Sequence, residues 1–307
     1  MIQKLVLLAL ATFAIISCNN SAHEVVILSF EKDLIPEGIA IDARSGRVFL
    51  SSLKKNKIVA ANINGSNSVD FIKKDQHGYL SGFGMTIKGD TLYALSNSLK
   101  KKDNSSVLLL LNIKTGELID KYQINSLPYA YLNDLAISAG NEIFITDSES
   151  NKIYKIKRPG KDLEVYLDTA EVAHSNGIAI SDDNSRLYLA SDRGIRIVDI
   201  GTKKILNHPN KQSSGIDGMK FYKNSLIGIV EKGVFRYYLN EKGIEIKSRK
   251  EIILFDNTFK SPTTFDISSD SIYFIKNTQL DNFNDSTNEV IDKTKLESLI
   301  LLKTKIE

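Results

Sequence analysis

Four side chains that carry oxygen donors stand at matching places in a repeated sequence pattern. Each lies two residues before a short apolar strand pattern, and the four are Glu37, Asn133, Asn176 and Asp217. Carboxylate and amide oxygens suit Ca²⁺, Mg²⁺ or Mn²⁺, whereas Zn²⁺ prefers histidine and cysteine. Two carboxylates offset the charge of one ion, and two amides add oxygens without further repulsion. We therefore expect one bound divalent metal, Ca²⁺ in the first place, with Mg²⁺, Mn²⁺ or Zn²⁺ as alternatives.

The four positions match because one strand-rich unit recurs along the chain. Its clearest copy, LNDLAISAGNEIFITDSESNKIYKI, occupies Leu132–Ile156. Aligned on the first strand, the six copies start at Ile39, Met85, Leu135, Ile178, Met219 and Phe265. Steps of 46, 50, 43, 41 and 46 residues are typical of a β-propeller, in which each sheet is buried between its neighbours. The sequence thus predicts an all-β fold, a six-bladed β-propeller with four-stranded antiparallel blades.

Equal register positions of a propeller form a ring, because the innermost strands all line the axis and run the same way. The six residues two before the starts are Glu37, Phe83, Asn133, Asn176, Asp217 and Thr263. Four of the six offer hard oxygen ligands. We therefore expect the metal site at one mouth of the central channel.

Other side chains near this ring are candidates for substrate binding. Phe83 offers no ligand and is expected to form a wall of the pocket, while Tyr129 and Tyr131 precede Asn133 and are expected to face the same mouth. His77 lies in the loop before the second copy. Loops at a ligand mouth often line the site, although a lone loop histidine is more commonly just solvated. We retain all four aromatic residues as candidates.

Several polar and small residues beside the ring have structural explanations. Asp134 points to the other side of its strand from the ring residue and is expected to bond backbone amides. Asp147 and Asp192 recur in register at the turn between the second and third strands and are interpreted as turn residues, with Asp147 exposed. Gly177 and Gly218 each follow a ring residue and are expected to let the backbone turn tightly into the strand.

Both ends of the repeated region carry further strand patterns. Glu24–Glu31 and Leu299–Ile306 lie outside the six copies. A ring of blades has to close, and we expect these two strands to pair within one blade. The sixth copy also carries a long polar segment, Asn277–Glu297, and loops of this length in compact domains are commonly functional or disordered. We expect it to cover one mouth of the channel, and the sequence does not say which.

The N-terminus has the pattern of an export signal. Lys4 precedes an apolar run, Leu5–Ile16, that is too short to span a bilayer of roughly 30 Å. The run ends in Ile-Ile-Ser-Cys, which resembles the lipobox of bacterial lipoproteins and predicts lipidation of Cys18. The expected division is a signal peptide at 1–17, a tether at 18–23 and the propeller at 24–307. The alternative is an ordinary signal peptide followed by a chance cysteine.

This interpretation predicts an exported bacterial lipoprotein held at a membrane by its lipid, with the leaflet and face left open. Cys18 is the only cysteine of the 307 residues, so the mature chain has no internal disulfide. The net charge of +3 is too small and too dispersed to indicate nucleic-acid binding. A composition of 42% hydrophobic and 25% charged residues is ordinary for a globular protein, expected here as a monomer.

Four phrases of the sequence resemble one enzyme family. PEGIAID, LNDLAISAGNEIFITD, SNGIAISDDNSRLYLASD and IDGMKF are similar to phrases of the senescence marker protein (regucalcin)/gluconolactonase family, over roughly Leu34–Asn284. The resemblance implies a six-bladed propeller with one axial divalent metal, whose ligands fall on Glu37, Asn133, Asn176 and Asp217. Members of the gluconolactonase branch often have an arginine where this chain has Tyr131.

The resemblance and the ring together predict metal-dependent hydrolysis of a small lactone or ester. A metal with open coordination positions polarises such a carbonyl. Asp217 is expected to activate water as a general base, as the resemblance implies for this position. The sequence contains no GxSxG motif and no Ser/His pair at matched register that would supply a nucleophile instead. The alternative is a non-catalytic propeller that binds a ligand or partner and holds a structural metal.

Overall fold

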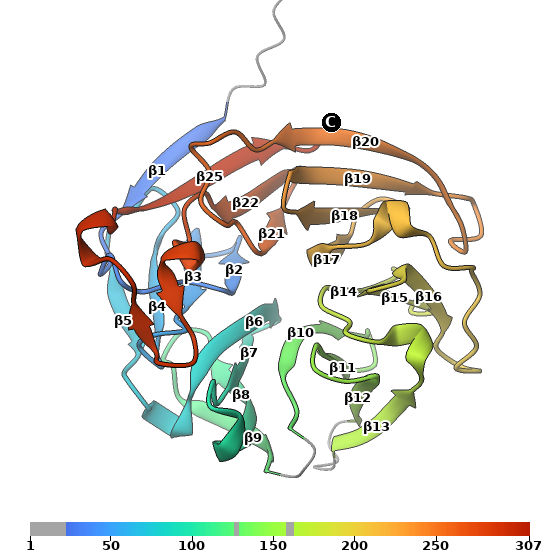
Figure 1. Cartoon of the computed structure of the whole chain (residues 1–307), viewed down its shortest axis with the longest axis horizontal. Coiled ribbons are helices and arrows are strands. Elements are labelled where there is room, and N and C mark those ends of the chain that lie inside the picture. The colour runs from blue at the N-terminus through green and yellow to red at the C-terminus, as the bar shows by residue number, and fades with distance from the viewer. Residues whose placement is uncertain (1–22, 126–128, 158–162) are drawn as a thin grey trace, which may run out of the picture.

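The computed structural model describes residues 23–125, 129–157 and 163–307. Six antiparallel sheets stand around a central axis as the blades of a β-propeller (Figure 1). Within the described residues, five blades have four strands. Blade 4 has three strands and, in place of the fourth, an isolated bridge between Val198 and Ile205. The predicted six-bladed propeller is confirmed.

The strands of blades 1 to 3 follow the chain from the axis outward. Blade 1 contains β2 (Ile39–Asp42), β3 (Arg47–Ser51), β4 (Ile58–Asn62) and β5 (Val69–Ile72). Blade 2 contains β6 (Ser81–Lys88), β7 (Thr91–Asn97), β8 (Ser106–Asn112) and β9 (Leu118–Ile124). Blade 3 contains β10 (Leu132–Ile137), β11 (Glu142–Asp147), β12 (Lys152–Lys157) and β13 (Leu163–Asp168).

Blades 4 and 5 continue the same order, whereas blade 6 takes its outermost strand from the N-terminus. Blade 4 contains β14 (Ile178–Ile180), β15 (Arg186–Ser191) and β16 (Gly194–Asp199). Blade 5 contains β17 (Ile216–Phe221), β18 (Ser225–Val230), β19 (Gly233–Leu239) and β20 (Ile246–Leu254). Blade 6 contains β21 (Phe265–Ser268), β22 (Ser271–Ile275), β25 (Leu299–Lys305) and β1 (Glu24–Leu28). All six predicted starts thus lie in the innermost strands.

Blade 6 closes the ring with strands from both ends of the chain. β1 pairs antiparallel with β25, from Glu24 opposite Lys303 to Leu28 opposite Leu299. Figure 1 shows the blue N-terminal strand beside the red C-terminal one. The expected pairing is confirmed, although β1 ends at Leu28 and not at Glu31. Because the first and last strands of the described chain are hydrogen-bonded to each other, blade 6 holds the two ends of the ring together.

The hydrophobic core lies between the blades. Phe49 of blade 1 and Met85 and Leu92 of blade 2 belong to one buried cluster, in which the Phe49 ring also meets Phe71 edge-on at 4.9 Å. Equivalent clusters fill the spaces between the other neighbouring blades. Complete burial of one such side chain contributes about 1.5–3 kcal/mol, so the repeated interfaces explain why single blades need their neighbours.

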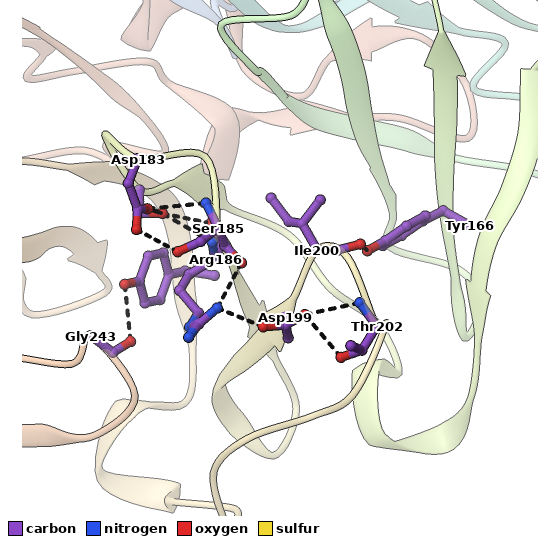
Figure 2. A network of polar contacts seen from close by, with 10 residues as sticks. Tyr166, Asp183, Ser185, Arg186, Asp199, Ile200, Thr202 and Gly243 are labelled. Carbon is purple, nitrogen blue, oxygen red and sulfur yellow. Dashed lines mark hydrogen bonds and ion pairs between the residues drawn. The ribbon is translucent and has the colours of Figure 1, made fainter.

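A polar network ties the three-stranded blade to its surroundings (Figure 2). The Arg186 Nη1 atom donates to the Ser185 carbonyl at 3.0 Å and to Asp199 Oδ2 at 2.6 Å. Hydrogen bonds from Ser181 and Ser185 hold the pKa of the Asp183 carboxyl at about 2. The Tyr166 hydroxyl of blade 3 donates to the Ile200 carbonyl at 2.9 Å, across the blade boundary. We interpret this network as structural.

Short helical turns and one hairpin complete the described fold. The 3₁₀ turns are η1 (Gln76–Gly78), η2 (Lys101–Asp103), η3 (Ala170–Val172), η4 (Lys211–Ser213), η5 (Leu280–Asn282) and η6 (Lys293–Lys295). The hairpin β23 (Phe283–Asn284) and β24 (Glu289–Val290) lies inside the long polar segment 277–297. None of the helical elements in the described part of the chain is long and apolar enough to cross a membrane. The predicted signal peptide and Cys18 lie outside the described residues.

Candidate functional site

The structure brings the four predicted ligands together at one end of the axis. Glu37, Asn133, Asn176 and Asp217, each from a different blade, line one cavity with a volume of about 10 Å³. A cavity of that size has room for about one water molecule or one metal ion. Each of the four residues is half-buried. The expected convergence of these four side chains at one place on the axis is therefore observed.

The ring residues lie outside regular strand pairing. In β6, β10 and β17 the register shifts across the ring position, so Phe83, Asn133 and Asp217 sit in bulges. In blades 1 and 4 the innermost strand begins only two residues after Glu37 and Asn176. Bulges and strand ends re-aim side chains that regular pairing would turn into the packed sheet. This irregularity lets the side chains reach a common point.

A left-handed backbone residue precedes the ring position in four blades. Ile35, His174 and Ser261 have φ angles of 49°, 50° and 49°, and Gly215 has 70°. Each stands two residues before its ring residue. For a residue other than glycine such a conformation costs on the order of 1–3 kcal/mol and is concentrated at functional sites. The strained turn at buried, β-branched Ile35 is the clearest case.

Glycine follows the ring residue where the innermost strands approach most closely. A Cβ atom on Gly38 would collide with the Phe83 carbonyl oxygen of the next blade. A Cβ on Gly177 would lie 2.6 Å from the Met219 nitrogen, and one on Gly218 equally close to the Thr264 hydroxyl. Neither Gly177 nor Gly218 has a positive φ. The predicted tight turn is therefore wrong, and contact between blades is the reason for these glycines.

Burial raises the pKa of both candidate carboxylate ligands. Burial, then the charge of Asp217, holds the pKa of Glu37 well above its ordinary value. Burial also raises the pKa of Asp217 to about 7, with Asp134 adding to the effect and the Asn176 hydrogen bond opposing it. The Glu37 Oε2 atom is buried and has no hydrogen-bond partner among the described residues. A buried carboxylate oxygen without a partner is unfavourable, and a cation in the cavity would compensate it.

Both amide side chains leave an oxygen for an ion. Asn133 Nδ2 donates to Ser148 Oγ at 3.3 Å, and Asn176 Nδ2 donates to Asp217 Oδ1 at 2.6 Å. Among the described residues neither amide oxygen accepts a hydrogen bond. No group of three or more His, Cys, Asp or Glu side chains in the described ranges is arranged to hold a metal. The set here has two carboxylates and two amides, and this donor chemistry fits a hard divalent ion.

A second charged layer lies in the channel beside the ring. Asp134 Oδ1 accepts from the Leu135 backbone nitrogen at 2.9 Å, as expected, and Oδ2 lies 3.6 Å from Lys220 Nζ. Asp266 accepts from the backbone nitrogens of Ile41 and Ile267. Burial raises the pKa of both Asp134 and Asp266, while the Lys220 charge lowers it. Lys220 and Asp266 also line a cavity of about 340 Å³.

A larger cleft opens onto the ring from blades 4 to 6. Its volume is about 600 Å³, and Asn176, Asp217 and Thr263 of the ring belong to its lining. The remaining lining includes His174, Asp192, Glu231, Phe255, Phe259 and Leu280. A cleft of this volume is within the range of small-molecule sites. The candidate ion would thus be reached from this side.

The opposite half of the mouth is filled by the long polar segment. Phe283 and Val290 of its hairpin share one apolar cluster with Phe83 and Tyr131. Gln279 anchors the segment, since its Nε2 donates to the Lys32 carbonyl at 2.8 Å. The mouth covered by residues 277–297 is therefore the one that carries the ring.

Three predicted substrate residues lie under that cover and not in the cleft. Phe83 is buried and meets Tyr131 edge-on at 4.7 Å, and Tyr131 in turn lies 5.7 Å from Tyr129. The Tyr129 hydroxyl donates to the Ser98 carbonyl at 2.6 Å. None of the three is among the described residues that line the 600 Å³ cleft. They form the closed side of the mouth.

His77 lies apart from the ring. Its Nε2 atom is 3.1 Å from the Gly116 carbonyl, in the turn between β8 and β9. It does not belong to the described lining of the ring cavity or of the cleft. The structure therefore separates His77 from the other candidates.

Most residues that line the cleft were not predicted as site residues from the sequence. Asp192 lines it, whereas Asp147 at the same register is only 1% exposed and accepts from the Tyr131 and Glu149 backbone nitrogens. The predicted role of Asp147 in the turn is confirmed by its bonds to Glu149 and Ser150, whereas its predicted exposure is wrong. His174 stands two residues before Asn176, so the repeat register placed it in the loop beside the ring, but its left-handed backbone with a φ of 50° was not predictable from the pattern. Its Nδ1 lies 2.9 Å from the Ser148 carbonyl, which can only accept, so Nδ1 carries the proton.

Comparison with known proteins gives the fold. No family model matches the chain, and no curated protein sequence matches it. A gluconolactonase from Xanthomonas campestris is similar in structure, with TM-score 0.59, 12% identity, and coverage of 92% of this chain and 89% of that chain. Regucalcin from Agrobacterium tumefaciens, a calcium-binding protein, has TM-score 0.60, 15% identity and coverage of 89% and 92%.

A third similar structure has another activity. An inactive variant of virginiamycin B lyase from Staphylococcus aureus, solved with quinupristin, has TM-score 0.63 and 17% identity, and covers 93% of this chain and 100% of that chain. At such identities the likeness shows the propeller fold alone. Function has to be argued from the site.

Proposed function

We propose that the protein is a metal-dependent hydrolase of a small lactone or ester. The observation that carries the proposal is the convergence of Glu37, Asn133, Asn176 and Asp217 beside an open cleft, with one Glu37 oxygen buried and unpaired. We propose Ca²⁺ as the ion, since all four donors are hard oxygens. A bound ion of this kind supplies polarisation of the substrate carbonyl.

The chain's own residues supply the remaining parts of the reaction. Asn176 fixes Oδ1 of Asp217 by a 2.6 Å hydrogen bond, so Oδ2 is the atom free to take a proton from water. Both residues line the cleft, where a substrate carbonyl has space to approach them. The covered side at Phe83 and Tyr131 excludes water from the other half of the mouth. The fold shared with a gluconolactonase and with regucalcin supports this assignment.

We also propose that the protein works at a membrane surface. The apolar run and Cys18 at the N-terminus support export and lipid attachment. A tether of residues 18–23 would hold the propeller, as a monomer, close to that surface. The substrate would then be a small molecule outside the cytoplasm.

The test is a panel of lactones and esters assayed after chelation and again with added Ca²⁺. The proposal expects turnover by the wild type that disappears with chelator and returns with the ion. Asp217→Asn, assayed beside the wild type, identifies turnover that belongs to this site. If no lactone or ester is turned over with any divalent metal, the ligand-binding propeller with a structural metal takes the place of the hydrolase.

A further inference from the structure

The cleft beside the ring has an apolar wall. The rings of Phe255 and Phe259 stack at 4.6 Å with an angle of 19° between their planes, and both line the cleft. They lie in the connection between β20 and β21 and line the same cleft as Asp217 of blade 5. The Lys276 ammonium already lies 4.8 Å from the Phe259 ring centroid. The pair therefore offers apolar contact more than a free face for a cation.

Two carboxylates face this wall from equivalent turns of adjacent blades. Asp192 follows β15 of blade 4, and Glu231 follows β18 of blade 5; both are exposed and line the cleft. Within the described residues, neither carboxylate has an ion-pair or hydrogen-bond partner. Some exposed carboxylates elsewhere on the molecule do have partners, as Asp270 has Lys223 at 2.8 Å and Glu297 has Lys260 at 2.8 Å.

No lysine or arginine of the described residues lines the cleft beside these charges, although Lys276 behind Phe259 acts on Asp256. The lining contains Asp192, Asp217, Glu231 and Asp256 and neither lysine nor arginine. Asp256 is already engaged, because its Oδ1 accepts from the Thr258 backbone nitrogen at 2.8 Å and from the Thr258 hydroxyl. Asp217 belongs to the candidate metal site. Asp192 and Glu231 are thus the two charges left to meet a ligand.

We infer that the cleft selects its ligand by charge, and that its substrates are lactones or esters with an apolar body and a positively charged group. The apolar body would lie along Phe255 and Phe259, and the positive group would lie near Asp192 and Glu231. Anionic substrates would be disfavoured, because beside the apolar wall they would meet the unpartnered carboxylates of Asp192 and Glu231 and neither lysine nor arginine in the described lining. This inference names the substrate class of the proposed hydrolase. The hydrolysis of such substrates rests on the proposed function, whereas the preference for binding a cation does not depend on hydrolysis.

The preference can be measured without catalysis. Benzyltrimethylammonium, phenylacetamide and phenylacetate share a phenyl group and differ in charge, and their dissociation constants are measured by ligand-observed NMR in low salt. We expect the cation to bind most tightly and phenylacetate most weakly. The difference should shrink in high salt, because exposed charges are screened. Replacing both carboxylates, as Asp192→Asn with Glu231→Gln, should reduce the preference by roughly five- to tenfold for each charge.

A matched control changes the net charge equally at a distance. Glu164 on β13 and Glu251 on β20 are exposed on outermost strands, so Glu164→Gln with Glu251→Gln should leave the preference unchanged. Equal binding of the cation and phenylacetate would overturn the inference. So would an equal loss of preference in the control. In parallel, kcat/KM is compared for p-nitrophenyl esters whose acyl groups are cationic, neutral or anionic. Selective cation binding without hydrolysis of any ester would refute the hydrolase and leave the charge preference standing.

Discussion

Asn176 donates a 2.6 Å hydrogen bond from Nδ2 to Oδ1 of Asp217, across the boundary between blades 4 and 5. Because the nitrogen is the donor, the amide oxygen is the atom left for a cation. The same bond favours the ionised form of Asp217 and so opposes the burial that raises the pKa of this carboxyl to about 7. Two of the four candidate ligands are therefore oriented before an ion binds.

Replacing Asp217 by asparagine should separate proton transfer from metal binding. Asp217→Asn keeps an oxygen that can contact the ion but removes the group that takes a proton from water. A positioned general base is worth about 10²–10⁴-fold, so kcat should fall by that order. The dissociation constant for Ca²⁺ should change less. Both constants are measured on a substrate identified in the panel.

Glu164→Gln is the control for this comparison, since Glu164 is exposed on the outer strand of blade 3. Asp147 is unsuitable for this purpose because it is buried and accepts two backbone hydrogen bonds. Full activity of Asp217→Asn on a substrate that the wild type hydrolyses would contradict the assigned role.

Added Ca²⁺ should raise the melting temperature, and chelator should reverse the rise. An ion that binds only the folded state stabilises it by about 2.7 kcal/mol at a hundredfold excess over its dissociation constant. Glu37→Gln should remove most of this effect, because the buried Glu37 oxygen then carries no charge for the ion. In a crystal with the ion, ligand oxygens should lie about 2.3–2.6 Å away. Identical melting curves with chelator and with Ca²⁺ would exclude the site.

The stability of the metal-free protein should fall as the pH rises. Asp217 has its pKa raised to about 7 by burial, and that of Glu37 is also raised. In the unfolded chain such carboxyls ionise near pH 4. Between about pH 4 and 7 the folded state therefore binds more protons than the unfolded state, and stability declines with pH through that window.

Thermal melts from pH 4 to 8 with chelator present measure this decline. Asp217→Asn should have a shallower slope than the wild type, which separates its contribution from those of other buried carboxyls such as Asp134. Ca²⁺ should flatten the wild-type profile, because it binds the ionised carboxylates. A metal-free wild type and Asp217→Asn with parallel profiles would show that Asp217 ionises normally.

Cys18 should carry the lipid that the N-terminal sequence predicts. Labelled palmitate should enter the wild type in a bacterial host and be absent from Cys18→Ser. The wild type should also sediment with membranes, and the variant should be released. Equal labelling of the two proteins would point to the ordinary signal peptide instead.

The ring was predictable from the sequence because it depends on local register. Ile39, Leu135 and Ile178 each begin or occupy an innermost strand, and the residue two before them must then reach the same mouth. Repetition of that register in six copies specified both the blade number and the meeting of Glu37 with Asp217.

The cleft was not predictable, because it depends on contacts between distant segments. Which half of the mouth stays open is decided by residues 277–297, whose hairpin packs on Phe83 and Tyr131. Nothing in the local pattern connects Phe283 with a strand some two hundred positions earlier. Likewise, His77 lies close to Phe83 in the sequence, yet its ring contacts the Gly116 carbonyl in the turn between β8 and β9 and lies outside the described lining of the ring cavity and the cleft.

The innermost strands of blades 1 and 2 approach each other closely at Gly38, so a larger residue there should destabilise the fold. Gly38 follows Glu37 directly, and a methyl group there would strike the Phe83 carbonyl of blade 2 and lie 2.9 Å from the Ser51 hydroxyl. Backbone cannot yield as a flexible side chain does, so Gly38→Ala should destabilise the protein by about 1–3 kcal/mol. The shift of blade 1 should also weaken Ca²⁺ binding through Glu37. Urea denaturation and a Ca²⁺ titration measure the two effects.

Gly140→Ala is the matched control. Gly140 lies in the turn between β10 and β11, its φ is not positive, and the nearest atom to an added Cβ is Ser138 Oγ at 3.8 Å. This substitution should change stability by no more than about 0.5 kcal/mol. If Gly38→Ala proves as stable as Gly140→Ala, the innermost strands have room to separate at this register. The glycines beside the ring would then need another explanation than contact between blades.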